Sequence, residues 1–495
     1  MLLQRFLETA QRQPDKLAIR DIRREATFSQ LIALSATMKR FIEAETPRPN
    51  VGILLPSTAG FAASFYGGLW AGKTIVPLNF LLPPAELAGI VADAGLDLIL
   101  TCEYFKDLAA ALPARSIILE RAGLRRRYLL SKVRPRPAVP DAGADDLAVI
   151  LYTSGTTGTP RGVCLTHGNL YTDAFASIEH FCIDANEQFL GIIPLFHSFG
   201  LTGTLLLPTL LGATVHFQAR FQPADVVQAV ARDRISVFLA VPSMLVAIAR
   251  DKTVPADTFQ GVRLPICGGE PLSPELWSEY RDRFGIELLE GYGLTETSPV
   301  VAANVPGANR PGTVGRALSV VETCVRDELG NALPSGQAGE LCFRGPTIMQ
   351  GYYNRPADTA AAIDVDGWFR SGDIGRLDAD GFITITGRCK DLIIVAGENV
   401  FPGEIERVLD RHPAVEQSAV IGTGDGVRGE SIVAFVVPRE GTAPTAIELR
   451  DYCRDHLAGF KVPRRIFFDR DLPKGPTGKL LKRQLRQRLA EGVSE

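Results

Sequence analysis

The chain has 495 residues, which is enough for two or more domains. Hydrophobic residues make up 46% and charged residues 22%, as in ordinary globular proteins, and the net charge of −3 gives no bulk attraction to nucleic acid. The eight cysteines are scattered and form no C-x-x-C pair. The composition therefore argues against structural zinc and a disulfide framework, and it fits the reducing cytoplasm.

The first 320 residues predict alternating strands and helices. Residues 1–16 predict an amphipathic helix that lacks the apolar core of a signal peptide. Short apolar runs typical of buried strands alternate with helical patterns; the strand runs are 51–56, 74–78 and 96–100, and the helical patterns between them are 59–71 and 84–94. This alternation predicts an α/β fold with buried parallel strands.

Two stretches bear on membrane contact. Residues 121–136 carry seven basic side chains, which we interpret as a solvated connector; a surface for a membrane or a phosphopantetheine carrier protein is the alternative. Residues 188–219 contain no Asp, Glu, Lys or Arg and are long enough to span a bilayer. Pro194 and Pro208 interrupt this run, so we expect a buried strand, a loop and a core helix instead of a transmembrane helix.

The pattern of alternating strands and helices ends after residue 320. Short strand-like runs and Gly-rich turns predict a small β-rich subdomain up to Arg388. Beyond it, residues 400–413 predict a helix, and residues 415–422 and 430–438 predict two strands. The C-terminal part therefore reads as a compact α+β domain.

The run YTSGTTGTPRG at residues 152–162 is the most informative motif. It follows the apolar strand-like run 147–152. Glycines let backbone N–H groups approach an anion, and hydroxyls and an arginine add donors and charge. The pattern predicts a phosphate-binding loop that is not a Walker A loop, with a flexible linker as the alternative. The candidate nucleotide-binding residues are Thr153, Ser154, Gly155, Thr156, Thr157, Gly158 and Arg161.

A second Gly-rich motif, GYGLTET, occupies residues 291–297. We expect Gly291 and Gly293 to form a tight turn beside a ligand, and Tyr292 to offer a flat face to a purine ring. Thr295 can donate to a phosphate. Glu296 is a hard oxygen ligand suited to Mg²⁺ on ATP phosphates, with a solvated surface carboxylate as the alternative.

Taken together, the motifs resemble the signatures of the adenylate-forming superfamily, which includes acyl-CoA synthetases, luciferases and the adenylation domains of peptide synthetases. The run ICGGEPL at 266–272 follows a strand-like segment, and the resemblance puts its Gly269 and Glu270 against adenine. Three more motifs come in the family's order, namely WFRSGDIG at 368–375, GRCKDLIIVAGENVFPGEIE at 387–406 and LPKGPTGKLLKR at 472–483. Two departures stand out: the family usually has Lys where this chain has Arg161, and some relatives have Lys where it has Ile394.

The resemblance implies roles for several residues of the C-terminal third. We expect Asp373 to sit in a turn, where its carboxylate can accept from both ribose hydroxyls; a turn-capping role is the alternative. Arg388 would assist at the ribose and phosphate, and Lys390 would mark the hinge. Gly397 would line a pantetheine tunnel. Lys479 would reach the carboxylate and the α-phosphate, where a cation stabilises the charge that builds during attack.

The fold that the resemblance implies has two parts. Residues 1–387 would form a large N-terminal domain of two α/β subdomains and a small β-rich one, and residues 388–495 would form a mobile α+β domain. The reaction would use ATP, Mg²⁺ and coenzyme A in two half-reactions: a carboxylate would attack the α-phosphate to give acyl-AMP, and a thiol would then displace AMP after the C-terminal domain rotates.

The substrate side of the site centres on PLFHSFGL at residues 194–201. His197 matches a residue that lies over the acyl carboxylate in family members that make acyl-CoA; a satisfied core histidine is the alternative. No carboxylate is available here to bind an α-amine, so a free amino acid is disfavoured. The candidate acyl-pocket residues are Phe199, Gly203, Pro242 and Gly268.

The neutral, aliphatic neighbourhood of this motif predicts an apolar acid, and we expect a medium- or long-chain fatty acid. Loading of an acyl carrier protein, release of the product as acyl-AMP, and an aryl acid as substrate remain alternatives. Arg161 also leaves open a non-catalytic, ATP-binding relative. We expect no nucleic-acid partner, no transmembrane span and, at most, peripheral contact with a membrane.

Overall fold

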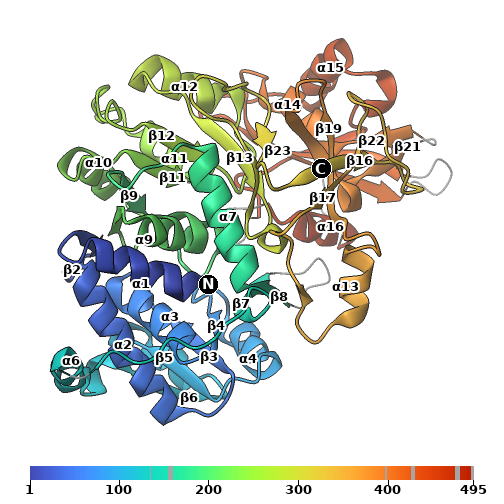
Figure 1. Ribbon diagram of the computed structural model, residues 1–495. Helices are drawn as coiled ribbons and strands as arrows, with labels where there is room; N and C mark the ends of the chain where they lie inside the picture. Colours follow the sequence, from blue (N-terminus) through green and yellow to red (C-terminus); the bar gives the residue numbers. More distant parts are fainter. Residues whose placement is uncertain (134, 154–159, 396–397, 425–429, 474–479, 492–495) are drawn as a thin grey trace. The chain divides into compact units, whose positions relative to one another are not determined.

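The computed structural model describes residues 1–133, 135–153, 160–395, 398–424, 430–473 and 480–491 (Figure 1). The chain forms two compact units. The first comprises Met1–Thr323 and Phe343–Phe369, and the second comprises Cys324–Cys342 and Arg370–Glu495. The predicted domain boundary between residues 387 and 388 and the predicted hinge at Lys390 stay predictions.

A seven-stranded sheet in the first unit has the order β18-β8-β7-β4-β3-β5-β6. Its strands are β3 (Asn50–Leu54), β4 (Thr74–Pro77), β5 (Leu98–Thr101), β6 (Arg115–Ile118), β7 (Leu147–Thr153), β8 (Arg161–Thr166) and β18 (Gly351–Tyr352). Strands β3 to β7 pair in parallel, whereas β8 is antiparallel to β7 and to β18. Every residue of β3, β4 and β5 is buried, which explains their continuous apolar runs.

A nine-stranded sheet in the same unit has the order β15-β14-β13-β12-β11-β9-β10-β1-β2. Its strands are β1 (Leu17–Arg20), β2 (Glu25–Thr27), β9 (Gln188–Gly191), β10 (Thr214–Phe217), β11 (Val237–Ala240), β12 (Leu264–Cys267), β13 (Leu289–Gly293), β14 (Val300–Ala303) and β15 (Arg316–Ala317). From β13 to β1 in this order, each strand is parallel to its neighbours. Strands β14 and β15 add antiparallel pairs at one edge. The two sheets confirm the predicted α/β class.

Helices cover these sheets. The helices of the first unit are α1 (Leu2–Arg12), α2 (Phe28–Glu45), α3 (Ala59–Trp70), α4 (Pro84–Asp93), α5 (Lys106–Ala110), α6 (Leu124–Val133), α7 (His167–His180), α8 (Ser198–Gly200), α9 (Leu207–Leu211), α10 (Pro223–Arg232), α11 (Pro242–Arg250), α12 (Pro274–Phe284) and α13 (Pro356–Ala362). In the predicted N-terminal helix, Phe6 and Leu7 are among the side chains buried on one face. Helices α2 and α3 pack closely at Gly67, which has no side chain. A β-carbon at this position would lie only 2.5 Å from that of Met38.

The charge-free run 188–219 folds as expected, into a strand, a loop and a helical segment. Strand β9 leads through a loop to α8, the π-helical turn Leu201–Leu206 and α9. Gly200 is required at this bend, because a β-carbon there would lie 2.3 Å from the carbonyl oxygen of Pro194. A search of the described residues finds no helix with the length and hydropathy needed to cross a membrane.

The basic stretch at 121–136 contains the helix α6, which packs against α2. Arg125, Arg126 and Arg127 are exposed on it, and the guanidinium of Arg127 lies over the ring of Phe41. The predicted solvated connector is thus partly helical. Arginine side chains on this helix can cover an apolar neighbour with their aliphatic stems.

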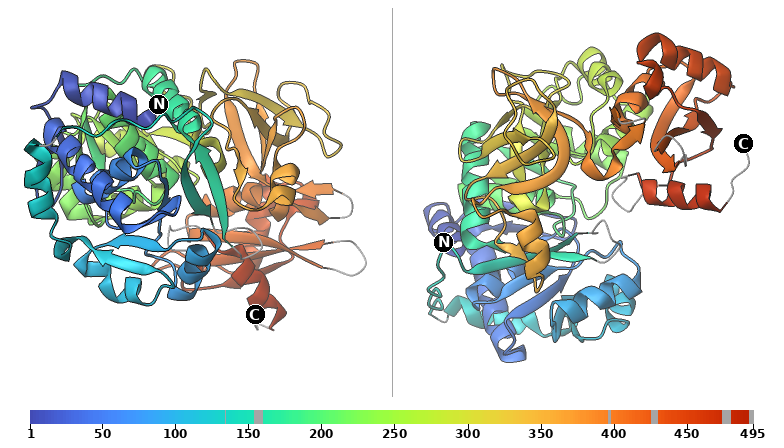
Figure 2. Two further views of the ribbon diagram at one scale, coloured as in Figure 1. Left: turned by 60° about the horizontal axis from the view of Figure 1, so that its bottom comes forward. Right: turned by 90° about the vertical axis from the view of Figure 1, so that its right-hand side faces the viewer.

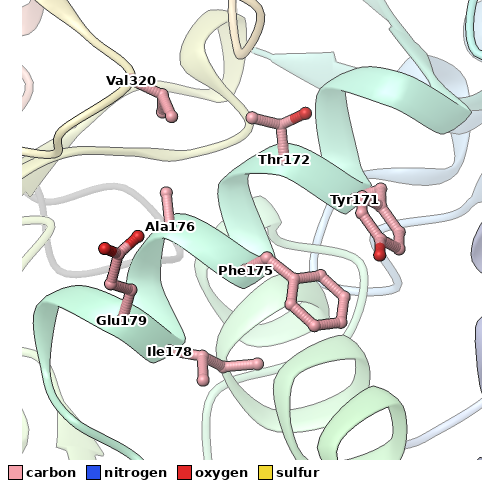
Figure 3. A pocket seen from close by; sticks show the side chains of 7 residues that line it. All are labelled: Tyr171, Thr172, Phe175, Ala176, Ile178, Glu179 and Val320. Atoms are coloured by element: carbon pink, nitrogen blue, oxygen red, sulfur yellow. The ribbon is translucent and has the colours of Figure 1, made fainter.

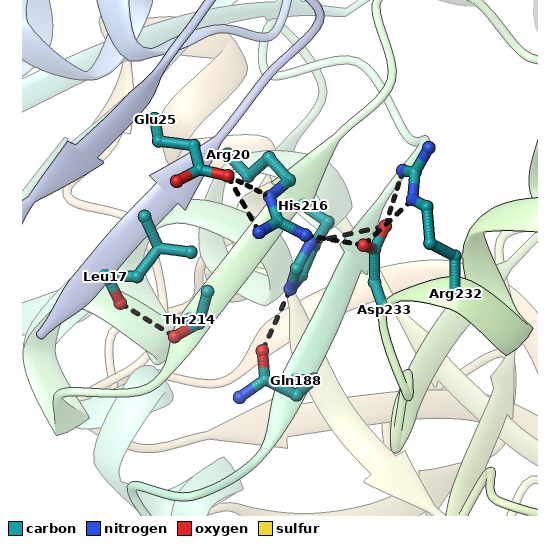
Figure 4. A network of polar contacts seen from close by, with 8 residues as sticks. All are labelled: Leu17, Arg20, Glu25, Gln188, Thr214, His216, Arg232 and Asp233. Atoms are coloured by element: carbon teal, nitrogen blue, oxygen red, sulfur yellow. Dashed lines mark hydrogen bonds and ion pairs between the residues drawn. The ribbon is translucent and has the colours of Figure 1, made fainter.

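A buried polar network ties the far edge of the nine-stranded sheet to α10 (Figure 4). Asp233 forms ion pairs with Arg20 and Arg232, both at 2.6 Å, and lies 3.5 Å from the ring of His216. The other ring nitrogen of His216 contacts Gln188 at 2.9 Å. Burial lowers the pKa of His216 to about 4, so this imidazole is neutral at physiological pH and completes a structural network.

The second unit combines three small sheets (Figure 2). The strands are β16 (Glu322–Arg326), β17 (Gly339–Arg344), β19 (Phe369–Leu377) and β20 (Ile383–Arg388) in a four-stranded sheet, β21 (Ile393–Val395) and β22 (Glu398–Val400) in a hairpin, and β23 (Val415–Gly424), β24 (Glu430–Pro438) and β25 (Arg465–Phe468) in a three-stranded sheet. Its helices are α14 (Pro402–Asp410), α15 (Ala446–His456) and α16 (Lys482–Ala490). The four-stranded sheet confirms the predicted β-rich segment, and the predicted helix and two strands after Arg388 appear as α14, β23 and β24.

Candidate active site

The stem of the predicted phosphate loop is a β-hairpin. Thr153, the last residue of β7, pairs with Arg161, the first residue of β8. The predicted loop residues Ser154, Gly155, Thr156, Thr157 and Gly158 lie outside the described residues. The β7 run Ala148–Leu151 is buried, so the two ends of the loop are anchored in the core of the sheet. Sequence reasoning identified the buried strand before the loop but not the hairpin.

Arg161 is held by two side chains from the segment that follows β17. Its Nε lies 3.6 Å from Oδ2 of Asp358, and its guanidinium carbon lies 5.4 Å from the centre of the Tyr352 ring. About a quarter of the Arg161 side chain is exposed. A guanidinium anchored in this way keeps its charge and can still offer N–H donors to an anion.

Glu296 and Thr295 lie in a 3₁₀ turn directly after β13. The Tyr352 hydroxyl donates to Oε1 of Glu296 at 2.9 Å, and the Glu296 carbonyl accepts from Met349 N–H at 2.8 Å. The Thr295 hydroxyl lies 3.3 Å from that of Ser198. Burial and the Glu296 carboxylate raise the pKa of Tyr352, so its phenol stays protonated and acts as the donor.

The two glycines of the GYG run serve close packing, and the predicted tight turn is wrong. Gly291 and Gly293 belong to strand β13, which pairs with β14. A β-carbon on Gly293 would lie 1.9 Å from the carbonyl oxygen of Pro299, so only glycine allows the returning chain to come this close. Tyr292 lies between them, with its ring 5.9 Å from that of Phe343.

The ICGGEPL segment follows β12, as predicted from its strand-like start. A β-carbon on Gly268 would lie 3.1 Å from the carbonyl oxygen of Gly291, and Gly269 has a φ of +83°. Glu270 accepts from the Ser243 N–H at 3.0 Å and from the Ser243 hydroxyl at 3.1 Å, at the start of α11. This loop is therefore tied to both β13 and α11.

A half-buried glutamate that contacts this loop was not predicted from the sequence. Glu290 lies in β13, and its Oε1 accepts from the Leu272 N–H at 3.2 Å. Burial raises the pKa of Glu290 to about 7, although the Leu272 hydrogen bond acts in the opposite direction. The carboxyl group thus links the GYG strand to the ICGGEPL loop.

The structure brings three of the four candidate acyl-pocket residues together. The Phe199 ring lies 3.8 Å and 3.9 Å from the points where β-carbons on Gly203 and Gly268 would sit. The ring is half-buried. A β-carbon on Gly203 would also lie 2.4 Å from the Leu239 side chain, so a larger residue at position 203 would require that side chain to move. The fourth candidate, Pro242, is buried as the first residue of α11.

His197 lies just before α8 and is half-buried. Its N–H donates to the Pro194 carbonyl at 3.0 Å, and its carbonyl accepts from the Leu201 N–H at 2.8 Å. These bonds fix its backbone between the loop and the helical segment. Its position over an acyl carboxylate stays a prediction.

Asp373, Arg388 and Lys390 belong to the second unit. The predicted turn at Asp373 is wrong, because the residue lies within strand β19 and pairs with Arg388 of β20. Gly372, with a φ of +70°, and a register shift after Ile374 bend the strand at this point, which the Ser-Gly-Asp pattern does not distinguish from a turn. Lys390 lies in a 3₁₀ turn after β20 and is exposed. Gly397 and Lys479 lie outside the described residues.

The residues present fit a magnesium ion carried by ATP. Oε1 of Glu296 is occupied by Tyr352, and Oε2 accepts no hydrogen bond from the described part of the chain. No cluster of three potential metal ligands among His, Cys, Asp and Glu occurs in that part. Mg²⁺ commonly takes one or two protein carboxylates and completes its shell with phosphates and water. One available carboxylate oxygen therefore matches an ion that arrives with its nucleotide.

A shallow hollow lies elsewhere, along the outer side of α7 (Figure 3). Tyr171, Phe175 and Ile178 of the helix line it together with Val320. None of the predicted site residues that the structure describes lines this hollow. It is therefore separate from the candidate active site.

Sequence reasoning missed the side chains that connect the motifs. Tyr352 donates to Glu296 of the GYGLTET motif, and Asp358 pairs with Arg161 at the end of the phosphate-loop motif. Ser243 donates to Glu270 of the ICGGEPL segment. Their own neighbours in the sequence form no recognised signature. The GYYN run around Tyr352 signals a turn or a short strand at most.

Comparison with known proteins identifies the family. The AMP-binding enzyme family matches residues 6–353, and the AMP-binding enzyme C-terminal domain matches residues 404–479. A feruloyl-CoA synthase from an Amycolatopsis species is 35% identical over 484 residues, which cover 97% of both chains. A long-chain-fatty-acid–CoA ligase from Bacillus subtilis (strain 168) is 30% identical over 526 residues, which cover 97% of this chain and 92% of the ligase.

A solved structure of o-succinylbenzoate coenzyme A synthetase from Bacillus subtilis, in complex with ATP and magnesium ion, matches with a TM-score of 0.85. Its sequence is 30% identical, and the match covers 97% of this chain and 99% of the synthetase. The ordered motifs, the two-sheet first unit and these matches agree. The chain belongs to the AMP-binding enzyme family of the adenylate-forming superfamily, and it is an acid–thiol ligase of the AMP-forming type.

Proposed function

We propose that this enzyme converts an aromatic carboxylic acid, such as a hydroxycinnamic acid, to its CoA thioester through an acyl-AMP intermediate. The observation that carries this choice is the half-buried Phe199 ring, which lies beside Gly203 and Gly268. A flat ring at this position offers a stacking or edge contact to an aromatic acid. The similarity to a feruloyl-CoA synthase supports the same class of substrate.

In the first half-reaction, a carboxylate oxygen of the acid attacks the α-phosphorus of ATP. The new oxygen–phosphorus bond forms as the bond to pyrophosphate breaks. Arg161 and the Thr295 hydroxyl would donate to phosphate oxygens whose charge increases, and fixed donors of this kind lower the barrier. Glu296 would hold Mg²⁺, which offsets the phosphate charge when it is bound. Lys479 would neutralise the attacking carboxylate.

In the second half-reaction, the thiol sulfur of CoA attacks the acyl carbon and AMP leaves. AMP is a good leaving group, whereas the oxygen of a free carboxylate is not, and this difference is the reason for activation. His197 would keep the acyl carbonyl in place between the two steps. The C-terminal domain would rotate about Lys390, so that Lys479 leaves the site and Gly397 enters it. This rotation would open the path for the pantetheine thiol.

A medium- or long-chain fatty acid is the second candidate. Two observations favour it: the pocket candidates are all neutral, with Leu239 directly behind Gly203, and the Bacillus subtilis relative is a long-chain-fatty-acid–CoA ligase. Medium chains can lie along an aliphatic wall without an aromatic contact. The two candidates therefore differ in how much they need the Phe199 ring.

Pyrophosphate release with a panel of acids tests the proposal. Ferulate, 4-coumarate, benzoate, octanoate and palmitate would each be offered with ATP, Mg²⁺ and CoA, and the thioester would be identified by mass spectrometry. We expect the aryl propenoic acids to react fastest. Phe199→Leu should raise the KM for these acids about fivefold, since aromatic pairs contribute on the order of 1 kcal/mol beyond their burial, and should leave octanoate unaffected.

The acceptor is tested in the same assay. With CoA replaced by a phosphopantetheinylated carrier protein, we expect acyl-AMP to accumulate without transfer. Efficient loading of the carrier and none of CoA would instead favour the carrier-protein alternative. Absence of pyrophosphate release with every acid would overturn the proposed function.

A further inference from the structure

Tyr352 connects two candidate nucleotide-binding residues that are far apart in the sequence. It lies in the short strand β18, opposite Val163 of β8. Its hydroxyl donates to Oε1 of Glu296 at 2.9 Å, and its ring lies 5.4 Å from the guanidinium carbon of Arg161. One side chain thus contacts the carboxylate of the second motif and the cation at the end of the first.

The two charged residues do not pair with each other. In the described part of the chain, Arg161 forms its ion pair with Asp358, and Glu296 has its side-chain hydrogen bond with Tyr352. An arginine and a glutamate this close to one tyrosine would attract each other strongly if the ring were absent. A direct pair would consume the donors of Arg161 and the carboxylate of Glu296.

We propose that Tyr352 is a positioning residue that keeps Arg161 and Glu296 apart and orients Glu296 towards Mg²⁺ and ATP. The hydroxyl fixes one carboxylate oxygen and leaves the other for the ion, while the ring face and Asp358 together fix the guanidinium. This inference rests on the proposed function, because it assigns Tyr352 a task in nucleotide binding. Tyr352 itself need not touch the reacting atoms.

The neighbouring tyrosine provides a matched control. The Tyr353 hydroxyl accepts from the side chain of Asn50, the first residue of β3, at 3.1 Å. Tyr352→Phe removes the contacts of the hydroxyl with Glu296 and Arg161 and keeps the ring over Arg161. Tyr353→Phe removes one hydroxyl of the same kind from the same strand region. The two variants therefore separate a nucleotide-site role from loss of a buried hydroxyl.

The test measures binding of a non-hydrolysable ATP analogue to the full chain by calorimetry, with Mg²⁺ and with EDTA. We expect Tyr352→Phe to weaken binding of the analogue with Mg²⁺ about tenfold, as for loss of a hydrogen bond to a charged group, and to leave binding in EDTA unchanged. Tyr353→Phe should match the wild type in both conditions. The unfolding temperatures of both variants should stay close to that of the wild type.

A double variant tests whether Tyr352 acts through Glu296. Glu296→Gln alone should weaken Mg²⁺-dependent binding, and adding Tyr352→Phe to it should cause little further loss, because the two changes remove one interaction. Losses that simply multiply would overturn the proposal. Equal Mg²⁺ dependence in Tyr352→Phe and Tyr353→Phe would also overturn it.

Two further results separate this inference from the proposed function. A wild-type protein that activates aryl acids, with a Tyr352→Phe variant unchanged in analogue binding, would leave the function standing and reject the role of Tyr352. A wild-type protein that releases no pyrophosphate with any acid, yet shows the expected Mg²⁺-dependent difference between the two tyrosine variants, would reject the function and support the role of Tyr352.

Discussion

Nε of Arg388 lies 2.9 Å from Oδ1 of Asp373, and the two residues face each other across strands β19 and β20. Only 4% of the Asp373 side chain is exposed, against 33% for Arg388. A carboxylate this enclosed would be costly to bury without a cationic partner. The pair therefore sets the position of the carboxylate that is proposed to accept from ribose hydroxyls.

We predict that Asp373→Ala destabilises the protein by about 2 kcal/mol, less than for a fully buried pair because Arg388 is partly exposed. Asp373→Asn should cost less, since the amide keeps its shape and one acceptor. Both variants should raise the KM for ATP about tenfold, through loss of charge-assisted bonds to the ribose. Urea unfolding and ATP titration measure the two effects. A stable Asp373→Asn protein with an unchanged KM for ATP would remove Asp373 from the nucleotide site.

The Glu290 carboxyl predicts a pH dependence of stability. Its pKa is raised to about 7 by burial, whereas in the unfolded chain it titrates near its ordinary value of about 4.3. Between these values the folded protein keeps a proton that the unfolded chain has lost. The stabilising contribution is thus present below about pH 4 and is lost as the pH rises through 7.

Glu290→Gln should remove this loss, because the amide carries no charge and can still accept from Leu272. We expect the variant to be more stable than the wild type at pH 8, by on the order of 2 kcal/mol, and to show no gain at pH 4. Thermal unfolding across this pH range measures the difference. The exposed Glu287→Gln serves as the control, and an equal gain in both variants would contradict the assignment.

Lys479 is expected to act in the first half-reaction alone. Lys479→Ala should abolish formation of acyl-AMP from ATP and acid, because no other cation is proposed to neutralise the attacking carboxylate. It should leave thioester formation from synthetic acyl-AMP and CoA intact. The two half-reactions are assayed separately, with pyrophosphate release for one and mass spectrometry for the other. Equal losses in both, in a folded protein, would make the assignment of Lys479 wrong.

Lys390 tests whether the enzyme alternates between two arrangements of its domains. Lys390→Pro should preserve adenylation and block transfer to the thiol, because proline fixes φ near −65° and prevents rotation at this residue. Lys390→Ala, which removes the side chain but not the freedom of φ, should retain both half-reactions. The expected signature is a full pyrophosphate burst without thioester. Normal thioester turnover in a folded Lys390→Pro protein would place the hinge elsewhere or argue against alternation.

The sequence by itself determined the features that depend on short-range patterns. Continuous apolar runs identified β3, β4, β5 and β7, because a parallel strand buried on both faces has no polar side. The ordered motifs identified the family, which the matches over residues 6–353 and 404–479 confirm. Pro194 and Pro208 predicted that the charge-free run is interrupted, and it forms β9, a loop and a helical segment.

Only the tertiary structure decided which side chains meet. The bond between Tyr352 and Glu296 joins residues 56 positions apart, and the contact of Arg161 with Asp358 joins residues 197 positions apart. Asp373 lies in a strand because Arg388 of β20 pairs with it, and position 293 needs glycine because the carbonyl oxygen of Pro299 comes so close to it. Such contacts depend on how distant segments pack, and packing follows from the shape and burial of the whole core, which no local pattern of residues contains.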